Sequence, residues 1–232
     1  MKQNWLKIEN SADGETLVID IEGRIGGDFW TGEGTTKSDI QAELKSMAGS
    51  KAKTIIVNID STGGDVNQGL SIHDILAQHK ANKEVRINGM TASAATIIAM
   101  AGNKITMSDN SLFLVHRASG GVGGNVHAIE MLAEDLKKID GLMANIYAKR
   151  TGMSAEEVMK QMDVNNGQGE WLTANEAKAK GFIDEIFEPT KMAASYDDET
   201  IKKFGLPPIP TNKTKTNSTM EKKNMVDEIV AK

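Results

Sequence analysis

The stretch over residues 88–102 constrains the fold most, because three kinds of local structure follow one another within it. Residues 85–88 are typical of a strand end, and the Gly-Met-Thr-Ala segment that follows is typical of a turn of small residues. The alanine-rich segment 93–101 predicts a helix. Ser93 opens this helix, where its hydroxyl would lie beside free backbone N–H groups, as a nucleophile requires. A serine that only caps a buried helix fits the same pattern.

Strands and helices alternate along the chain on both sides of this stretch. Strand-like apolar runs occupy residues 16–21, 53–59, 84–88, 104–107 and 111–115, and amphipathic helices are expected at 38–47 and 67–79. The run 54–59 is nearly all apolar, which is typical of a strand buried in a parallel sheet. Strand–helix–strand alternation of this kind predicts an α/β fold with a parallel sheet and βαβ crossovers.

A long amphipathic helix is expected from about residue 125 to residue 150. Its apolar residues recur at helical spacing and form a stripe about six turns long. They are Ile129, Leu132, Leu136, Ile139, Met143, Ile146 and Tyr147. One modest sheet would cover only part of such a stripe, and uncovered apolar patches mark interfaces, so we expect a homo-oligomer. Packing of the helix on its own domain alone is the alternative.

Composition narrows the class of protein. The 232 residues suffice for one globular domain, and a net charge of −5 without a basic patch argues against nucleic-acid binding. The chain has no cysteine, which excludes disulfides and thiolate sites. Its longest apolar stretch is too short to span a membrane, and we expect a cytoplasmic protein. Beyond Pro189 the sequence becomes polar and turn-prone, so we expect a domain over 1–189 and a flexible tail over 190–232.

A nucleophilic serine needs a general base, and the chain has four histidines. His116 follows the strand-like run 112–115 and precedes a glycine-rich loop, a place where functional residues concentrate. His73, His79 and His127 are expected on exposed helix surfaces, where a histidine needs no special role. A buried, hydrogen-bonded histidine at a strand end is the alternative for His116.

Four ordered segments resemble those of the Clp-family serine peptidases. They read DSTGGDVNQGLSIHDIL, NGMTASAATIIAMAG, LFLVHRASGG and GEWLTANEAKAKGFIDEI. The resemblance covers roughly residues 15–188 and is greatest to the phage-encoded branch that matures procapsids. It implies a ClpP/crotonase-like fold with a protruding handle helix, a ring-forming homo-oligomer and ATP-independent cleavage of polypeptides, among them capsid or scaffold proteins. No cofactor and no metal are expected.

The resemblance also implies a role for each site residue. Ser93 would be the nucleophile and His116 the base. The backbone N–H groups of Gly64 and Ala94 would hold the oxyanion of the tetrahedral intermediate. A glycine pair after a strand can also form a phosphate-binding loop, but here no Gly-x-Gly-x-x-Gly pattern and no following lysine accompany it.

The third member of the triad is where this sequence departs from the family pattern. The family places an acid shortly before the aromatic residue that matches Trp171. Counting forward from the preceding helix reaches Asn165, with Asp163 two residues earlier, whereas counting backward from Trp171 ends beside Glu170. The acid orients the imidazole and stabilises its charged form. We predict Asp163 for this role, with Glu170 and Asn165 as the alternatives.

Two other functions are compatible with these residues. Crotonase-type acyl-CoA enzymes share the architecture and use backbone oxyanion holes, but they need no serine–histidine pair. A catalytically degenerate Clp-like protein could instead serve as an assembly factor or scaffold. Reaction with a serine-directed fluorophosphonate separates both from a peptidase.

Overall fold

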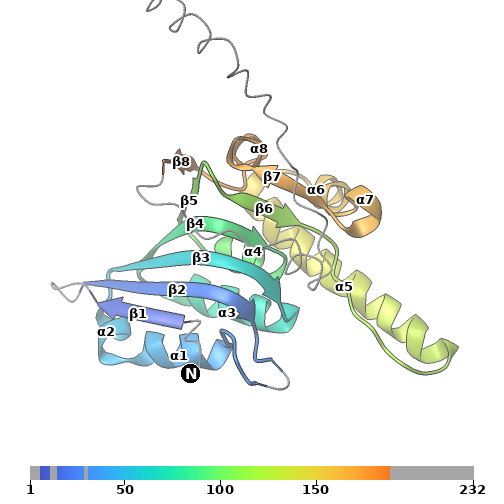
Figure 1. The fold of residues 1–232 in the computed structure, drawn as a ribbon, viewed down its shortest axis with the longest axis horizontal. Coiled ribbons are helices and arrows are strands. Elements are labelled where there is room, and N and C mark those ends of the chain that lie inside the picture. Colours follow the sequence, from blue (N-terminus) through green and yellow to red (C-terminus); the bar gives the residue numbers. More distant parts are fainter. Residues whose placement is uncertain (1–5, 11–14, 29–30, 189–232) are drawn as a thin grey trace, which may run out of the picture.

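The computed structural model describes residues 6–10, 15–28 and 31–188. Within these residues eight strands form one sheet in the order β1-β2-β3-β4-β5-β8, with β6 pairing with both β4 and β7 (Figure 1). The strands are β1 (Leu6–Asn10), β2 (Thr16–Ile25), β3 (Thr54–Gly64), β4 (Asn82–Ala92), β5 (Lys104–Ser108), β6 (Leu112–Val115), β7 (Glu170–Thr173) and β8 (Glu185–Phe187). The expected tail over 190–232 lies outside the described residues.

The helices follow the predicted alternation. They are α1 (Lys37–Lys45), α2 (Met47–Lys51), α3 (Val66–Gln78), α4 (Ala94–Ala99), α5 (Val126–Thr151), α6 (Ala155–Met162), α7 (Val164–Gly167) and α8 (Ala174–Ala179). Short polar side chains begin several of them, as the sequence indicates. Thr36, Ser154 and Thr173 each form a capping box at a helix N-terminus.

The α/β fold with a largely parallel sheet is confirmed. Strands β2, β3, β4 and β5 are parallel to one another, and β6 and β8 run parallel to β4 and β5. Two pairs are antiparallel, β1 with β2 and β6 with β7. Strands β1, β7 and β8 were not predicted from the sequence, because each is only three to five residues long.

One face of the sheet carries the core. Alternate residues of β2, β3, β4 and β5 have no or almost no exposed surface, and they are Leu17, Ile19, Ile21, Ile55, Val57, Ile59, Val85, Ile87, Ile105 and Met107. Helices α3 and α4 lie behind the sheet on this side (Figure 1). The opposite face is more polar: Asn58 Nδ2 donates a hydrogen bond of 2.6 Å to Asp20 Oδ1 there. Within the described residues, α3 and α4 cover the apolar face.

Strand β4 changes partner halfway along its length, and this positions the site. Its first part pairs with β5, whereas residues 90–92 pair with β6. Gly89, with φ of 66°, lies between the two parts. A second, small apolar cluster of Met90, Ala92, Leu114 and Trp171 packs around the last part of β4. The segment that leads into Ser93 is thus held by β3 on one side and by β6 on the other.

Helix α5 divides into two halves with different surroundings. Met143, Ala144 and Tyr147 in its C-terminal half are buried in the core. The N-terminal half projects away from the body of the molecule (Figure 1), and Ile129 and Met131 there are 55% and 68% exposed. Gly152, in the left-handed conformation at φ 76°, ends the helix. The predicted long helix is confirmed, and only its second half packs on its own domain.

Candidate active site

Ser93 lies at the junction of β4 and α4 in an unusual backbone conformation. Its φ of 56° and ψ of −130° fall in a region that residues other than glycine rarely adopt, at a cost of about 1–3 kcal/mol. The side chain makes no hydrogen bond to cap the helix. Strain at a strand-to-helix turn that leaves a serine hydroxyl unengaged is how hydrolases present a nucleophile. The helix-cap alternative therefore does not describe this serine.

The glycine pair at the end of β3 lies directly against this turn. A Cβ on Gly63 would lie 2.7 Å from Ser93 Cβ and 2.9 Å from the amide nitrogen of Ala94. A Cβ on Gly64, whose φ is 150°, would lie 2.2 Å from the carbonyl oxygen of Ile25. Both positions therefore exclude larger residues. Because Ala94 is the first residue of α4, its amide has no partner within the helix.

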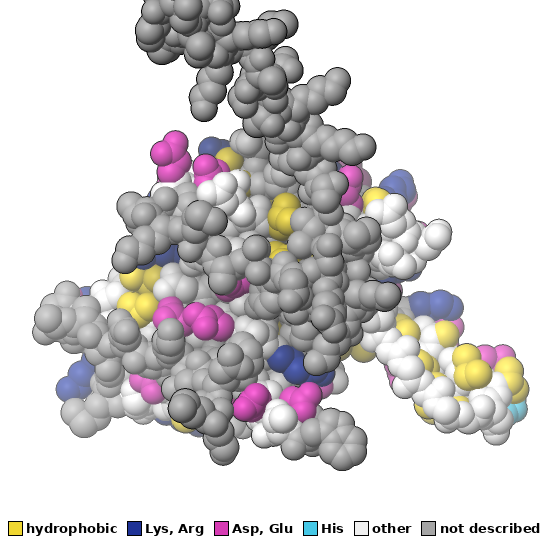
Figure 2. All heavy atoms as spheres, viewed as in Figure 1, with side chains coloured by type: hydrophobic (Ala, Val, Ile, Leu, Met, Phe, Trp, Pro, Cys, Tyr) yellow, Lys and Arg dark blue, Asp and Glu magenta, His cyan; other side chains and the backbone are white. Residues whose placement is uncertain are grey.

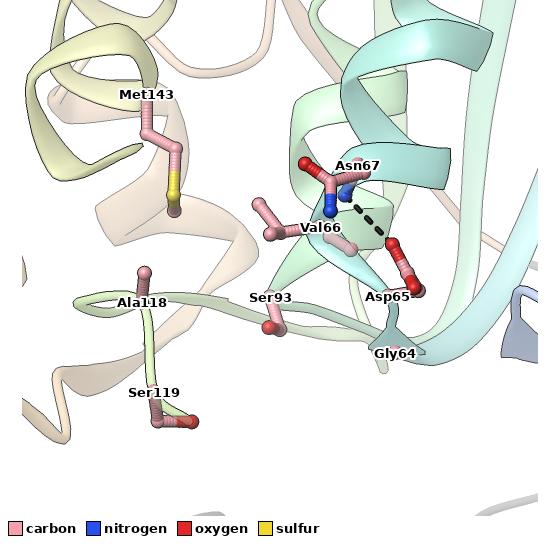
Figure 3. A pocket seen from close by; sticks show the side chains of 9 residues that line it. Gly64, Asp65, Val66, Asn67, Ser93, Ala118, Ser119 and Met143 are labelled. Atoms are coloured by element: carbon pink, nitrogen blue, oxygen red, sulfur yellow. Dashed lines mark hydrogen bonds between the residues drawn. The ribbon is translucent and has the colours of Figure 1, made fainter. Parts of the chain in front are cut away.

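Ser93, Gly64 and Ala94 line one pocket with a volume of about 220 Å³ (Figure 3). Its lining comes from four separate segments: the end of β3 with the start of α3, the β4–α4 junction, the segment after β6, and α5. The full lining is Gly64, Asp65, Val66, Asn67, Ser93, Ala94, Ala118, Ser119 and Met143. Figure 3 shows Ser93 between the α3 side chains and Ala118, with Met143 reaching in from α5. The structure thus brings together three of the predicted site residues.

His116 follows β6, and residues on both sides of it flank Ser93. The amide of Ser93 donates a 3.0 Å hydrogen bond to the carbonyl oxygen of Leu114, and Ala118 lines the same pocket as Ser93. The imidazole Nε2 is buried and has no hydrogen-bond partner among the residues that the structure describes. Burial lowers the pKa of His116 below its ordinary value, and a hydrogen bond with the Arg117 backbone opposes this effect. The ring is therefore neutral at physiological pH, as a general base must be.

The three candidates for the acid lie near His116 but differ in their contacts. Asp163 caps the end of α6, and its 60% exposed carboxylate lies 3.2 Å from Arg117 Nε. Asn165, in the left-handed conformation at φ 54°, donates from Nδ2 to the carbonyl oxygen of Gly169 at 2.9 Å. Glu170 is exposed and belongs to β7. The assignment of Asp163 stays a prediction.

The loop that carries these candidates passes directly against the histidine. A Cβ on Gly169 would lie 2.9 Å from His116 Cβ and 2.2 Å from the carbonyl oxygen of Val115. The amide of Arg117 donates a 3.1 Å hydrogen bond to the carbonyl oxygen of Gly167. Residues 163–170 are therefore fixed next to His116 by the backbone itself.

Two polar residues of α5 near the site were not identified from the sequence. Asp140 is 3% exposed and lies 3.5 Å from Arg117 Nε, so that it shares Arg117 with Asp163. Tyr147 has no exposed surface, and its hydroxyl lies 2.7 Å from Thr96 Oγ1. An aspartate within an apolar stripe was a usable signal, because a buried carboxylate needs partners.

The other three histidines contact neighbouring residues of their own segments, and His73 and His79 are half-buried rather than exposed as expected. His73 lies 2.9 Å from its neighbour Asp74 on α3, and His127 lies 3.5 Å from Glu130 on the exposed surface of α5. Among the described residues, no group of three or more side chains is placed to hold a metal ion. No helix in the same part of the chain combines the length and apolarity needed to cross a bilayer.

Comparisons with known proteins agree with this geometry. The chain is 34% identical over 152 residues to the ATP-dependent Clp protease proteolytic subunit 2 of Gluconobacter oxydans, which covers 64% of this chain and 66% of that protein. It is 33% identical over 159 residues to the ATP-dependent Clp protease proteolytic subunit of Streptococcus pneumoniae, covering 66% of this chain and 79% of that protein.

A solved structure also resembles the chain. A mutant of ClpP1 from Listeria monocytogenes superposes with a TM-score of 0.62 at 28% identity, over 77% of this chain and 94% of that one. The Clp protease family model matches residues 32–190, which include every residue of the pocket and His116. The chain belongs to the Clp protease family of serine-type endopeptidases.

Proposed function

We propose that the chain is a Clp-type serine endopeptidase that cleaves polypeptides with Ser93 and His116 and without a cofactor. The observation that carries the proposal is the conformation of Ser93. Ser93 is strained, its side chain makes no hydrogen bond that caps the helix, and it lines a pocket near a buried, neutral histidine. Strain of this kind costs free energy and is retained mainly where the residue has a function. The family membership supports the same reaction.

The geometry supports a two-step acyl transfer. Ser93 Oγ attacks the scissile carbonyl carbon while His116 Nε2 accepts the hydroxyl proton, and the backbone N–H groups of Gly64 and Ala94 stabilise the oxyanion. His116 then donates the proton to the leaving amine, and a water molecule hydrolyses the acyl-enzyme by the same route in reverse. The pocket walls combine the apolar residues Val66, Ala118 and Met143 with the polar residues Asp65, Asn67 and Ser119.

We propose that residues 163–170 supply the third member of the triad, with Asp163 as the first candidate. Its carboxylate is paired with Arg117, so it would have to exchange that partner for His116. Alanine substitutions of Asp163, Asn165 and Glu170, made singly, assign the role. The variant with the largest fall in kcat identifies the residue, and three silent variants would indicate a Ser93–His116 dyad.

The test of the function is Ser93→Ala, with Ser119→Ala as the matched control, because both serines line the same pocket. Ser93→Ala should lose peptide cleavage by a factor on the order of 10⁴ or more and all labelling by a fluorophosphonate. Ser119→Ala should be labelled and active. Cleavage by Ser93→Ala at the wild-type rate would refute the peptidase, and an unlabelled wild-type protein would favour a degenerate assembly factor or a crotonase-type enzyme.

We also propose that the protein forms a ring-like homo-oligomer through the projecting half of α5. Figure 2 shows hydrophobic side chains on the surface of this projection, and Val126, Ile129 and Met131 are 60%, 55% and 68% exposed. The occupant of this surface is a second copy of the chain, because the solved and curated relatives named above are peptidase subunits of the same fold. Light scattering should give a mass several times 25.0 kDa.

The last proposal concerns which polypeptides the protein cleaves. We propose cleavage of capsid or scaffold proteins in the cytoplasm of a host cell, on the resemblance to the phage-encoded branch. Incubation of wild-type protein and Ser93→Ala with a purified procapsid scaffold protein tests it. Cleavage by the wild type alone supports the assignment, whereas an intact scaffold in the presence of an active peptidase would contradict it.

A further inference from the structure

Helix α5 carries two polar side chains in its buried half that the proposed reaction does not itself use. Asp140 is 3% exposed and Tyr147 is not exposed at all. They are seven residues apart, close to two helical turns, and therefore lie on the same face of the helix. Burial of a carboxylate and a phenol hydroxyl is unfavourable unless each has partners. The partners of these two groups lie on the two segments that carry Ser93 and His116.

Tyr147 is connected to the backbone of Ser93 through Thr96. Thr96 Oγ1 lies 2.6 Å from the carbonyl oxygen of Ser93 and 2.7 Å from Tyr147 Oη. A carbonyl oxygen only accepts, so the single hydroxyl proton of Thr96 is donated to Ser93, and Tyr147 must donate to Thr96. Burial raises the pKa of Tyr147, which keeps its hydroxyl protonated as this chain requires.

These bonds fix the orientation of the strained turn. The carbonyl oxygen of Ser93 also accepts from the amide of Thr96 at 2.9 Å, so that side chain and backbone hold it together. Tyr147 is itself held by an edge-on contact with Phe182, at a centroid separation of 5.9 Å. The conformation of Ser93 is thereby stabilised from α5 through a fully buried donor chain.

Asp140 is connected to the segment that follows His116. Its Oδ1 accepts a 2.7 Å hydrogen bond from the amide of Ala118, and its Oδ2 lies 3.5 Å from Arg117 Nε. Two consecutive residues after the histidine are therefore anchored on one carboxylate. The hydrogen bond from the Ala118 amide to the carboxylate is charge-assisted and therefore stronger than a neutral one, whereas Arg117 Nε forms an ion pair at 3.5 Å without a hydrogen bond.

We propose that α5 sets the relative position of nucleophile and base, with Tyr147 as the positioning residue for Ser93 and Asp140 as the positioning residue for His116. The inference rests on the proposed peptidase function. The two catalytic groups belong to different segments, the β4–α4 junction and the end of β6, which meet through the pairing of residues 90–92 with β6 and through the hydrogen bond from the Ser93 amide to the carbonyl oxygen of Leu114. Helix α5 contacts both segments, the first through Tyr147 and the second through Asp140.

Tyr147→Phe removes the donor and keeps the ring that packs on Phe182, so it tests the first connection. Thr96→Val breaks the same chain, and Thr96→Ser restores the hydroxyl. Thr106→Val is the matched control, because Thr106 Oγ1 also bonds a backbone carbonyl, that of Val85, in a part of the sheet remote from the pocket. Tyr147→Phe and Thr96→Val should be labelled by a fluorophosphonate about 10- to 100-fold more slowly, the range for a slightly misplaced reacting group.

The second connection is tested by a graded pair. Asp140→Ala removes both contacts, whereas Asp140→Asn keeps an oxygen for the amide of Ala118 and loses only the charge that faces Arg117. The expected order of kcat is wild type, then Asp140→Asn, then Asp140→Ala. Asp135→Asn, which removes an exposed carboxylate from the same helix, is the control.

Rate and stoichiometry separate positioning from loss of structure. A positioning role lowers the rate of labelling while every molecule is eventually labelled. Wild-type rates in Tyr147→Phe and Asp140→Asn would overturn the inference. So would a reduced labelled fraction that still reacts at the wild-type rate, because that result describes a partly unfolded sample. If Ser93→Ala is labelled and active, the proposed function fails instead, and the two failures are thus distinguishable.

Discussion

The two halves of α5 share one amphipathic pattern but have opposite environments. In the C-terminal half the apolar face packs against α4 and Phe182, and Met143 is 2% exposed. In the N-terminal half the nearest neighbour is the glycine-rich loop, where a Cβ on Gly120 would lie 3.6 Å from Leu132. Ile129, which belongs to the apolar stripe, remains 55% exposed in this half. Periodicity reports that a face is apolar, and it does not say whether the same chain or a second copy covers it.

The polar and charged residues of α5 also differ between its two halves. Asp140 and Tyr147 both belong to the packed half, where each is hydrogen-bonded to a catalytic segment. The charged side chains of the projecting half pair with their own helix in solvent, as Lys137 does with Glu134 and Lys138 with Asp135. Such exposed pairs contribute little to stability. One half of α5 therefore supports the site, and the other is available for assembly.

The largest effect is expected from Met143→Asp in the packed half. An unpaired carboxylate would be buried in the core and beside the pocket, which should lower the free energy of unfolding by about 3–5 kcal/mol. Urea unfolding followed by circular dichroism measures it. Glu134→Gln, an exposed change in the projecting half, is the control and should stay within about 0.5 kcal/mol of the wild type. Equal losses in both variants would remove the distinction between the halves.

The next effect concerns assembly, and it is expected from the projecting half. Met131→Asp and Ile129→Asp place a charge in the exposed apolar surface and should shift the protein toward the 25.0 kDa monomer in light scattering. Glu134→Gln, an exposed change without effect on the apolar surface, should assemble normally. An unchanged oligomer in both aspartate variants would place the interface elsewhere.

The smallest effect is expected at acidic pH, where the labelling of Ser93 should fall while assembly through the projecting half of α5 should not change. Because burial depresses the pKa of His116, the imidazole stays neutral until the pH falls below its ordinary value of 6.5. Labelling of Ser93 should therefore be constant above pH 6.5 and fall about tenfold per unit below a midpoint under that value. Apolar contacts of the projecting half should keep the oligomer intact through this range. A labelling midpoint above pH 6.5 would contradict the burial of the imidazole.

Much of the fold could be predicted because its signals are local. The apolar run that became β3, the small-residue helix α4 and the capping box at Ser154 each follow from a few adjacent residues. Strands β1, β7 and β8 could not be found, since a strand of three to five residues is stabilised by its partner rather than by its own sequence.

The candidate site, like the fold, could be predicted from the sequence only in part. Ser93, His116 and the glycines near them could be identified from the order of motifs, because each follows a predicted strand and lies at a turn. The acid could not be assigned, because Asp163, Asn165 and Glu170 lie in one loop and spacing alone does not say which side chain reaches the imidazole. Asp163 forms an ion pair with Arg117, which also lies near Asp140. This arrangement depends on how α5, α6 and the segment after β6 pack together.

The sequence by itself therefore determined the α/β alternation, the small-residue turn that carries Ser93 and the strand end that carries His116, because propensity, glycine positions and apolar periodicity act over a few residues. Only the tertiary structure decided that Ser93 adopts a left-handed φ, that β4 exchanges β5 for β6 ahead of it, and that Tyr147 and Asp140 reach the two catalytic segments. These features depend on contacts between residues 22 to 51 positions apart, and such contacts form only when the sheet and α5 pack together.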